Sequence, residues 1–106
     1  MRNLSIKRNK SLAGCLGKVH VYIEDADNGE LSIKGVACRR LGELKNGEEK
    51  TFSIPTVQTK VFVIGDIATR EFCSDSKVVP AGDADVRLSG KNTFDPQKGN
   101  PFVFDK

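Results

Sequence analysis

The sequence predicts an all-β protein, a single-domain β-sandwich of about seven to eight short, mostly antiparallel strands. Many short segments alternate large apolar and polar side chains, which is the period of a strand with one buried face. Ten glycines and four prolines interrupt the chain too often for long helices. A chain of 106 residues has room for one domain, which we place at residues 1–106.

The N-terminal part contains two alternating segments, residues 3–8 and 18–23. We interpret residues 1–17 as a basic strand followed by a connection of small residues. In the second segment, three aliphatic side chains should point into the core. His20 and Tyr22 should then point to solvent, because alternate residues of a strand face opposite sides.

An acidic turn is predicted at residues 24–30. Its glycine spacing does not fit an EF-hand calcium loop. A hairpin turn in which Asn28-Gly29 supplies a positive φ is the better interpretation. Residues 31–38 should follow as one strand that Gly35 bends.

The most apolar part of the chain is residues 41–64, and we expect the other strands to be arranged around it. Residues 50–54 alternate, and Pro55 ends this strand because proline lacks the N–H that a sheet requires. Residues 61–64, Val-Phe-Val-Ile, form an unbroken apolar run that is typical of a central strand covered on both faces. We expect these two strands to form a central hairpin.

Two further strands are predicted in the C-terminal part. Residues 84–89 alternate apolar and polar side chains. Residues 102–104, Phe-Val-Phe, should form a closing strand that docks into a sheet. Residues 67–72 are compatible with either one helical turn or a continued strand, and the sequence leaves both open.

Positive charge is concentrated at the N-terminus. The first 18 residues contain five basic and no acidic residues, whereas the remainder contains twelve basic and fourteen acidic ones. The candidate anion contacts are Arg2, Lys7, Arg8, Lys10 and Lys18. Such an arm either binds an anionic partner or forms a solubilising edge strand. We prefer the edge strand and do not expect nucleic-acid binding, because no aromatic residues interleave these charges.

No motif predicts catalysis, a metal or a cofactor. The single histidine, His20, cannot complete a usual zinc site with the scattered cysteines, and no nucleophile–base pair or phosphate-binding loop is recognisable. We therefore expect no enzyme activity and no catalytic, metal-binding or cofactor-binding residues. A carboxylate site stays open as an alternative, and its candidate residues are Asp66, Asp75, Asp83 and Asp85.

A set of residues between positions 18 and 64 carries a family resemblance. They are Val19, Val21, Ile23, Leu44, Gly47, Phe52, Ile54, Pro55, Val61 and Val63. In this pattern the chain resembles small bacterial β-sandwich modules of the PEGA and carboxypeptidase-regulatory-like type. The resemblance implies a non-catalytic accessory domain, and it transfers no functional residue.

These observations together predict a non-catalytic binding or interaction module. Its partner should be another protein or a second copy, joined through an exposed edge strand. The alternative is binding of an anionic surface or nucleic acid through the N-terminal arm. The odd number of cysteines, Cys15, Cys38 and Cys73, suits a reducing cytoplasm. No stretch approaches the roughly 20 apolar residues that span a bilayer.

Overall fold

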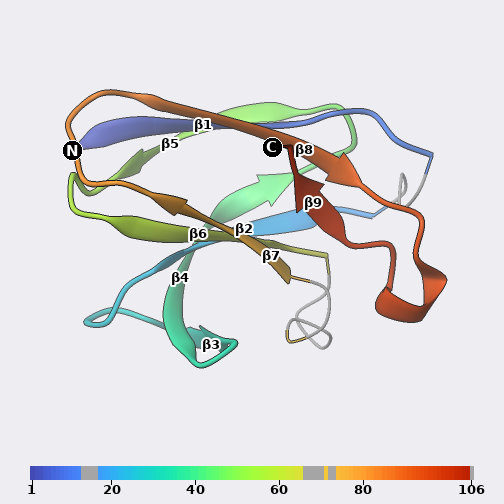
Figure 1. The fold of residues 1–106 in the computed structure, drawn as a ribbon, viewed down its shortest axis with the longest axis horizontal. Coiled ribbons are helices and arrows are strands. Elements are labelled where there is room, and N and C mark those ends of the chain that lie inside the picture. The colour runs from blue at the N-terminus through green and yellow to red at the C-terminus, as the bar shows by residue number, and fades with distance from the viewer. Residues whose placement is uncertain (13–16, 66–70, 72–73, 106) are drawn as a thin grey trace.

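The computed structural model describes residues 1–12, 17–65, 71 and 74–105. In this part of the chain, nine strands form two facing sheets (Figure 1). One short 3-10 helix (Pro96–Lys98) lies between the last two strands. The predicted all-β sandwich is thus confirmed, and the molecule measures 36 × 25 × 21 Å. The strands are β1 (Arg2–Arg8), β2 (Val19–Glu24), β3 (Leu31–Ile33), β4 (Val36–Leu44), β5 (Glu49–Ile54), β6 (Thr59–Ile64), β7 (Ser74–Val79), β8 (Val86–Asn92) and β9 (Phe102–Phe104).

The first sheet has the strand order β5-β1-β8-β9. β1 pairs antiparallel with β5 and parallel with β8, so the basic N-terminal strand is central. The expectation of a solubilising edge strand was therefore wrong. Lys7 is tolerated in a central strand because it faces solvent, whereas the inward Arg2 and Arg8 donate to acceptors within the protein.

The second sheet has the order β3-β4-β2-β6-β7 and is antiparallel throughout. β5 and β6 do not form the expected central hairpin, because β5 pairs with β1 whereas β6 pairs with β2 and β7. The link at residues 55–58 crosses from one sheet to the other. Pro55 begins that link, and its missing N–H prevents β5 from continuing its ladder.

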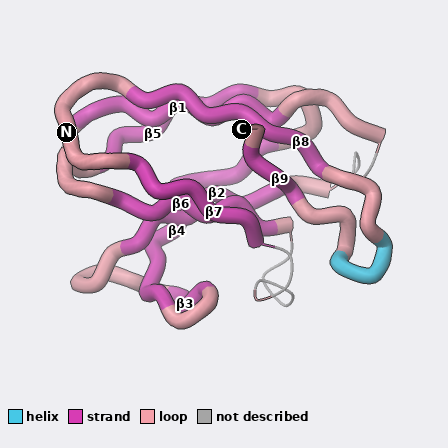
Figure 2. Tube along the Cα trace, viewed as in Figure 1, coloured by secondary structure: helices cyan, strands magenta, loops and turns pink. Residues whose placement is uncertain are grey.

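Residues 31–38 form two strands rather than one bent strand. Lys34 and Gly35 have φ values of 50° and 80°, and Ile33 pairs directly with Val36. Two successive positive φ values are the signature of a tight two-residue hairpin turn. Glycine therefore reverses the chain here instead of bending it. Figure 2 shows this hairpin below β2 and β6.

The acidic stretch before β3 is a turn, but it does not join two paired strands, because β2 pairs with β4. Gly29 lacks the expected positive φ. It is required for another reason, since a Cβ atom there would lie 2.7 Å from the Asp25 carbonyl oxygen and 2.8 Å from the Ala37 Cβ atom. Close packing of the turn on β4 thus explains this glycine.

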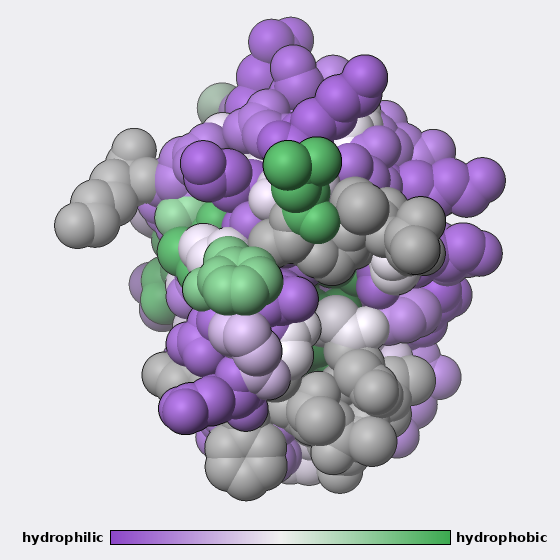
Figure 3. All heavy atoms as spheres, turned by 90° about the vertical axis from the view of Figure 1, so that its right-hand side faces the viewer, coloured by the Kyte–Doolittle hydropathy of each residue, from purple (hydrophilic) through white to green (hydrophobic). Residues whose placement is uncertain are grey.

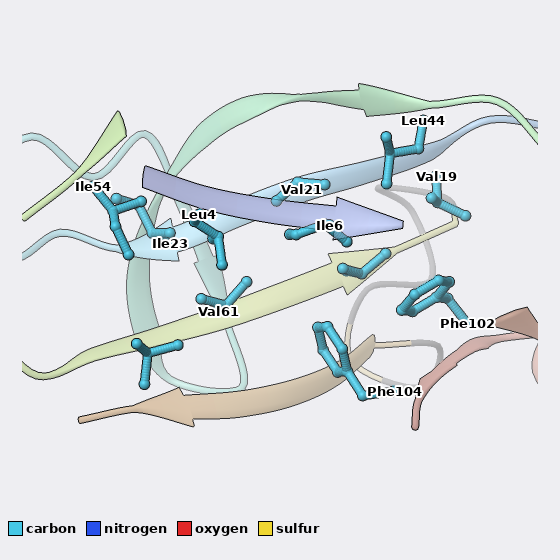
Figure 4. Packing of buried hydrophobic residues seen from close by; sticks show 12 residues of the cluster. Leu4, Ile6, Val19, Val21, Ile23, Leu44, Ile54, Val61, Phe102 and Phe104 are labelled. Carbon is cyan, nitrogen blue, oxygen red and sulfur yellow. The ribbon is translucent and has the colours of Figure 1, made fainter. Parts of the chain in front are cut away.

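The main core lies between the two sheets (Figure 4). It contains Leu4, Ile6, Val19, Val21, Ile23, Leu44, Ile54, Val61, Val63, Val79, Phe102 and Phe104. The two phenylalanines of β9 meet edge to face, with ring centroids 5.3 Å apart. The expected docking of residues 102–104 into a sheet is confirmed by the pairing of β9 with β8.

A second apolar cluster lies on the outer face of the five-stranded sheet. Tyr22, Ile33, Cys38, Phe62 and Ile64 form it. Tyr22 is only 4% exposed, so the prediction that it faces solvent was wrong. Alternation assigned its face correctly, but residues from β3 and β4 also pack on that face and bury it. The unbroken apolar run in β6 is explained by the same two-sided burial.

Candidate binding surfaces

The three lysines among the predicted anion contacts have different surroundings. Lys7 is exposed on the outer face of the first sheet. Lys10 lies beside the turn at Gly47, and the Nζ atom of Lys18 is 3.4 Å from the Glu43 Oε2 atom. The Glu43 carboxylate beside Lys18 reduces the attraction of this position for an anionic partner.

Arg8 is buried and joins separate parts of the chain. Its Nε donates to Asn92 Oδ1 at 2.9 Å, and its Nη1 donates to the carbonyls of Gly17 at 2.8 Å and Leu44 at 2.9 Å. These acceptors come from the end of β8, from Gly17 two residues before β2, and from the end of β4. The side chain thus holds one end of the sandwich together, which is a structural role.

Arg2 is buried at the other end of β1, with 5% of its surface exposed. Its Nε and Nη2 atoms donate to the carbonyls of Pro55 and Val57, each at 3.1 Å. No carboxylate among the described residues forms an ion pair with it. A guanidinium group has five N–H donors, so these two bonds leave three without a protein partner in the described part of the chain.

Arg2 lines a groove of about 310 Å³ between β7 and the first half of β8. The groove wall is mainly apolar and includes Val79, Val86 and Leu88. The loop 80–85, which connects the two strands, closes one end over Arg2. An apolar groove with a buried cation at its closed end has the chemistry of a site for an anionic ligand with an apolar body.

A larger cleft of about 640 Å³ lies at the opposite end of β1. Leu12 and Phe94 line it and are 96% and 80% exposed. Figure 3 shows apolar side chains standing out from this otherwise hydrophilic end of the molecule. Exposed apolar residues are a common feature of protein interaction sites, but the cleft contains no buried charge that would identify an occupant.

In the acidic turn, the Asp25 carboxylate accepts hydrogen bonds from neighbouring groups of the protein. Asp25 Oδ1 accepts the N–H groups of Asp27 at 3.1 Å and Asn28 at 2.9 Å, and Oδ2 accepts Arg39 Nε at 3.0 Å. The Asn28 N–H, followed by the Arg39 side chain, lowers the pKa of Asp25. Within the residues that the structure describes, no group of histidine, cysteine and carboxylate side chains is arranged to hold a metal ion.

The candidate carboxylates of the C-terminal half have structural partners. Asp75 Oδ2 accepts the Phe104 N–H at 2.8 Å, and Asp85 Oδ1 accepts the Asn3 N–H at 3.0 Å. Asp83 is exposed, and Asp66 lies outside the described residues. This arrangement does not favour a paired carboxylate site.

The thiol and imidazole groups show no catalytic arrangement in the described part of the chain. Cys38 is fully buried, and burial, reinforced by Glu24, raises the pKa of its thiol to about 11. Its Sγ atom donates to the Val36 carbonyl at 3.3 Å. His20 Nδ1 lies 3.4 Å from Arg40 Nη2 on the surface. Cys15 and Cys73 fall outside the described residues.

Side-chain carboxylates bond one outward N–H group in each of three strands. Glu30 Oε1 accepts the N–H of Arg40 in β4 at 3.0 Å. Asp75 bonds the edge strands of both sheets. Its Oδ1 accepts the N–H of Ser76 in β7 at 2.9 Å, and its Oδ2 accepts the N–H of Phe104 in β9. A capped N–H group cannot pair with a further strand, which protects these edges from association.

β5 is an edge strand without such a cap. Arg8 N–H donates to Glu48 at 2.9 Å, and this fixes the alternation of the β1–β5 ladder. The main-chain groups of Glu49, Thr51 and Ser53 therefore point away from β1, and these three residues are exposed. The sequence indicated an edge strand somewhere in the sandwich, but no local signal placed it at β5.

No protein-family model matches this chain, and comparison with curated proteins finds no match. The resemblance to PEGA and carboxypeptidase-regulatory-like modules is supported only as far as a two-sheet all-β fold. Within the part of the chain that the structure describes, no helix has the length and hydrophobicity needed to cross a membrane.

Proposed function

We propose that this protein is a non-catalytic interaction module that self-associates through the uncapped edge of β5. The observation that carries the proposal is the contrast between edges. Carboxylates bond outward N–H groups of β4, β7 and β9, whereas those of β5 have no protein partner in the described part of the chain. An unpaired row of N–H and C=O groups is a template for another strand.

The charges of β5 suit antiparallel pairing with a second copy. In a two-fold pair centred on Thr51, Glu49 lies opposite Ser53 and Lys50 lies opposite Phe52. No like charges face each other across the pair in this register. The two four-stranded sheets would then join into one continuous sheet across the dimer.

Charge substitutions at Ser53 test this register. Ser53→Lys places a cation opposite Glu49 of the second copy and should tighten the dimer, whereas Ser53→Glu places like charges together and should weaken it. Two such pairs per dimer predict a change in Kd of about two- to thirtyfold in each direction. Sedimentation equilibrium of the three proteins at low salt measures these constants. Equal constants for the two variants would refute the register.

Thr51→Pro is the test of edge pairing itself. Its N–H points away from β1, so proline removes a bond from the dimer and none from the sheet. Thr51→Val is the matched control, because both variants lose the hydroxyl that bonds Ser5 Oγ at 2.8 Å but only proline loses the N–H. The dimer should disappear in the proline variant alone. A wild-type protein that stays monomeric at millimolar concentration would reject self-association.

The proposal keeps the protein among non-catalytic accessory domains of the PEGA and carboxypeptidase-regulatory-like kind. The residue pattern between positions 18 and 64 supports that kinship. A buried, protonated thiol at Cys38 is compatible with the cytoplasmic location that the proposal retains.

A further inference from the structure

We propose that the groove between β7 and β8 binds the C-terminal end of an extended peptide, with the terminal carboxylate on Arg2. The occupant pairs with the open edge of β8 and places an apolar side chain over the groove wall. This site lies along strands other than β5, so it does not depend on self-association.

Arg2 supplies the anion-binding group. Its guanidinium is 5% exposed, and its two carbonyl partners are neutral, so its positive charge has no ion-pair partner among the described residues. Nη1 makes no hydrogen bond there and lies close to Gly82 in the loop that closes the groove. A carboxylate at this position would accept charge-assisted hydrogen bonds from a donor that the fold already holds in place.

The neighbouring main chain supplies the strand pairing. Gly90 accepts the Asn9 N–H on the β1 side of β8, whereas Ser89 accepts the Asp105 N–H on the other side. By alternation, the N–H and C=O groups of Arg87 also point away from β1. β9 pairs with residues 90–92, and Asp105 bonds Ser89, so among the described residues no strand pairs with residues 86–88 on this side (Figure 1).

The groove fixes the direction and length of the peptide. A peptide that enters where β9 ends and runs antiparallel to β8 has its C-terminus at the closed end, next to Arg2. Because Asp105 already pairs with Ser89, the open path runs from residue 88 to residue 85 and measures about 10 Å at the usual strand rise, which is the length of about three residues. The carboxylate thereby selects a peptide end over an internal segment.

The groove wall selects the side chain beside the carboxylate. Val79 is buried in the core, and Val86 and Leu88 are partly buried against it. An aliphatic side chain laid over these residues would remove apolar surface from water. The groove volume of about 310 Å³ accommodates a few small side chains, but not several large aromatic ones.

Asp85 lines the same groove and opposes an anionic ligand. Lys77 also lines it, and its Nζ donates to the Asp105 carbonyl at 3.3 Å. Neutralising Asp85 should therefore strengthen binding. Asp85→Asn retains an oxygen that can accept the Asn3 N–H, so this change removes the charge and spares the fold.

The test is an NMR titration of the ¹⁵N-labelled protein with a short peptide of alternating threonine and valine that ends in valine. The free acid should shift the amide signals of Arg87, Leu88 and Gly82. The same peptide with an amidated C-terminus should bind at least about tenfold more weakly, because it lacks the charge that Arg2 recognises. Asp85→Asn should bind the free acid about two- to threefold more tightly.

Several outcomes would overturn the proposal. They are equal affinity for the acid and the amide, shifts confined to the cleft at Leu12 and Phe94, or no saturation at millimolar peptide. Binding of octanoate at the groove without binding of the peptide would reject the peptide occupant. Arg2→Gln should abolish the preference for the free acid over the amide. The acid and amide comparison in the unaltered protein decides the question even if that variant fails to fold.

Discussion

Two arginines of one strand show how local surroundings decide the role of a side chain. Arg8 has three acceptors inside the structure, whereas Arg2 has two and keeps free donors beside a groove. From composition alone, both arginines were assigned to one basic N-terminal arm. Both arginines occupy even positions of β1, as Leu4 and Ile6 do, and therefore share the inward face. The count of charged residues does not include this positional information.

Asp25 gives a prediction on pH dependence at the residue scale. Its pKa is lowered in the folded protein, so it stabilises the fold above its unfolded pKa of about 4. That contribution should be lost as the pH falls through the lower folded value. Asp25→Asn should flatten the pH dependence of the free energy of unfolding below about pH 4.

Carboxyl ¹³C shifts followed through an acid titration measure the pKa of Asp25 directly, and urea unfolding at each pH measures the stability. A titration of Asp25 at the ordinary aspartate pKa would contradict the hydrogen bonds that we describe in this turn.

At the scale of elements, the alternation of apolar and polar residues predicted the buried face of a strand better than it predicted which strands pair. The segments that became β1, β2, β8 and β9 were predicted because each carries apolar residues at every second position. β7 was missed because most of its residues are polar. The β5–β6 hairpin was wrong because a short link can either turn within a sheet or cross between sheets, and the sequence pattern is the same in both cases.

The candidate sites were less predictable than the strands. The groove at Arg2 is assembled from β1, β7 and β8, which are far apart in the sequence. The uncapped edge of β5 is recognised only when the carboxylate caps on the other strands are known. Neither the groove nor the capping contacts correspond to a local sequence motif.

Gly90 provides a prediction at the scale of the β8–β9 pair. A Cβ atom there would collide with the Val103 carbonyl oxygen and would lie 2.6 Å from the Phe102 Cζ atom. Gly90→Ala should therefore destabilise the protein by about 1–3 kcal/mol. Urea unfolding measures the loss.

Gly65→Ala is the matched control, because a Cβ atom at that position meets no atom of the described residues within 4 Å. It should change the free energy of unfolding little. Equal stability of the two variants would show that β9 does not approach β8 as closely as described.

At the scale of the whole molecule, β1 lies between β5 and β8 and pairs with both in the first sheet. Deleting residues 1–8 should therefore unfold the protein, because it removes both ladders and the core residues Leu4 and Ile6. Loss of amide dispersion in an NMR spectrum measures this outcome. A truncated protein with native-like dispersion would contradict the central position of β1.

The parallel pairing of β1 with β8 has a consequence for protein synthesis. During synthesis β1 cannot find that neighbour until residues 86–92 have been made, and β9 pairs with β8 only once residues 102–104 follow. One hydrogen-bonding edge of β1 must therefore remain unpaired while residues 9–85 are made. Nascent chains of this fold should therefore be clients of ribosome-associated chaperones, with the sandwich closing late rather than growing from its N-terminus.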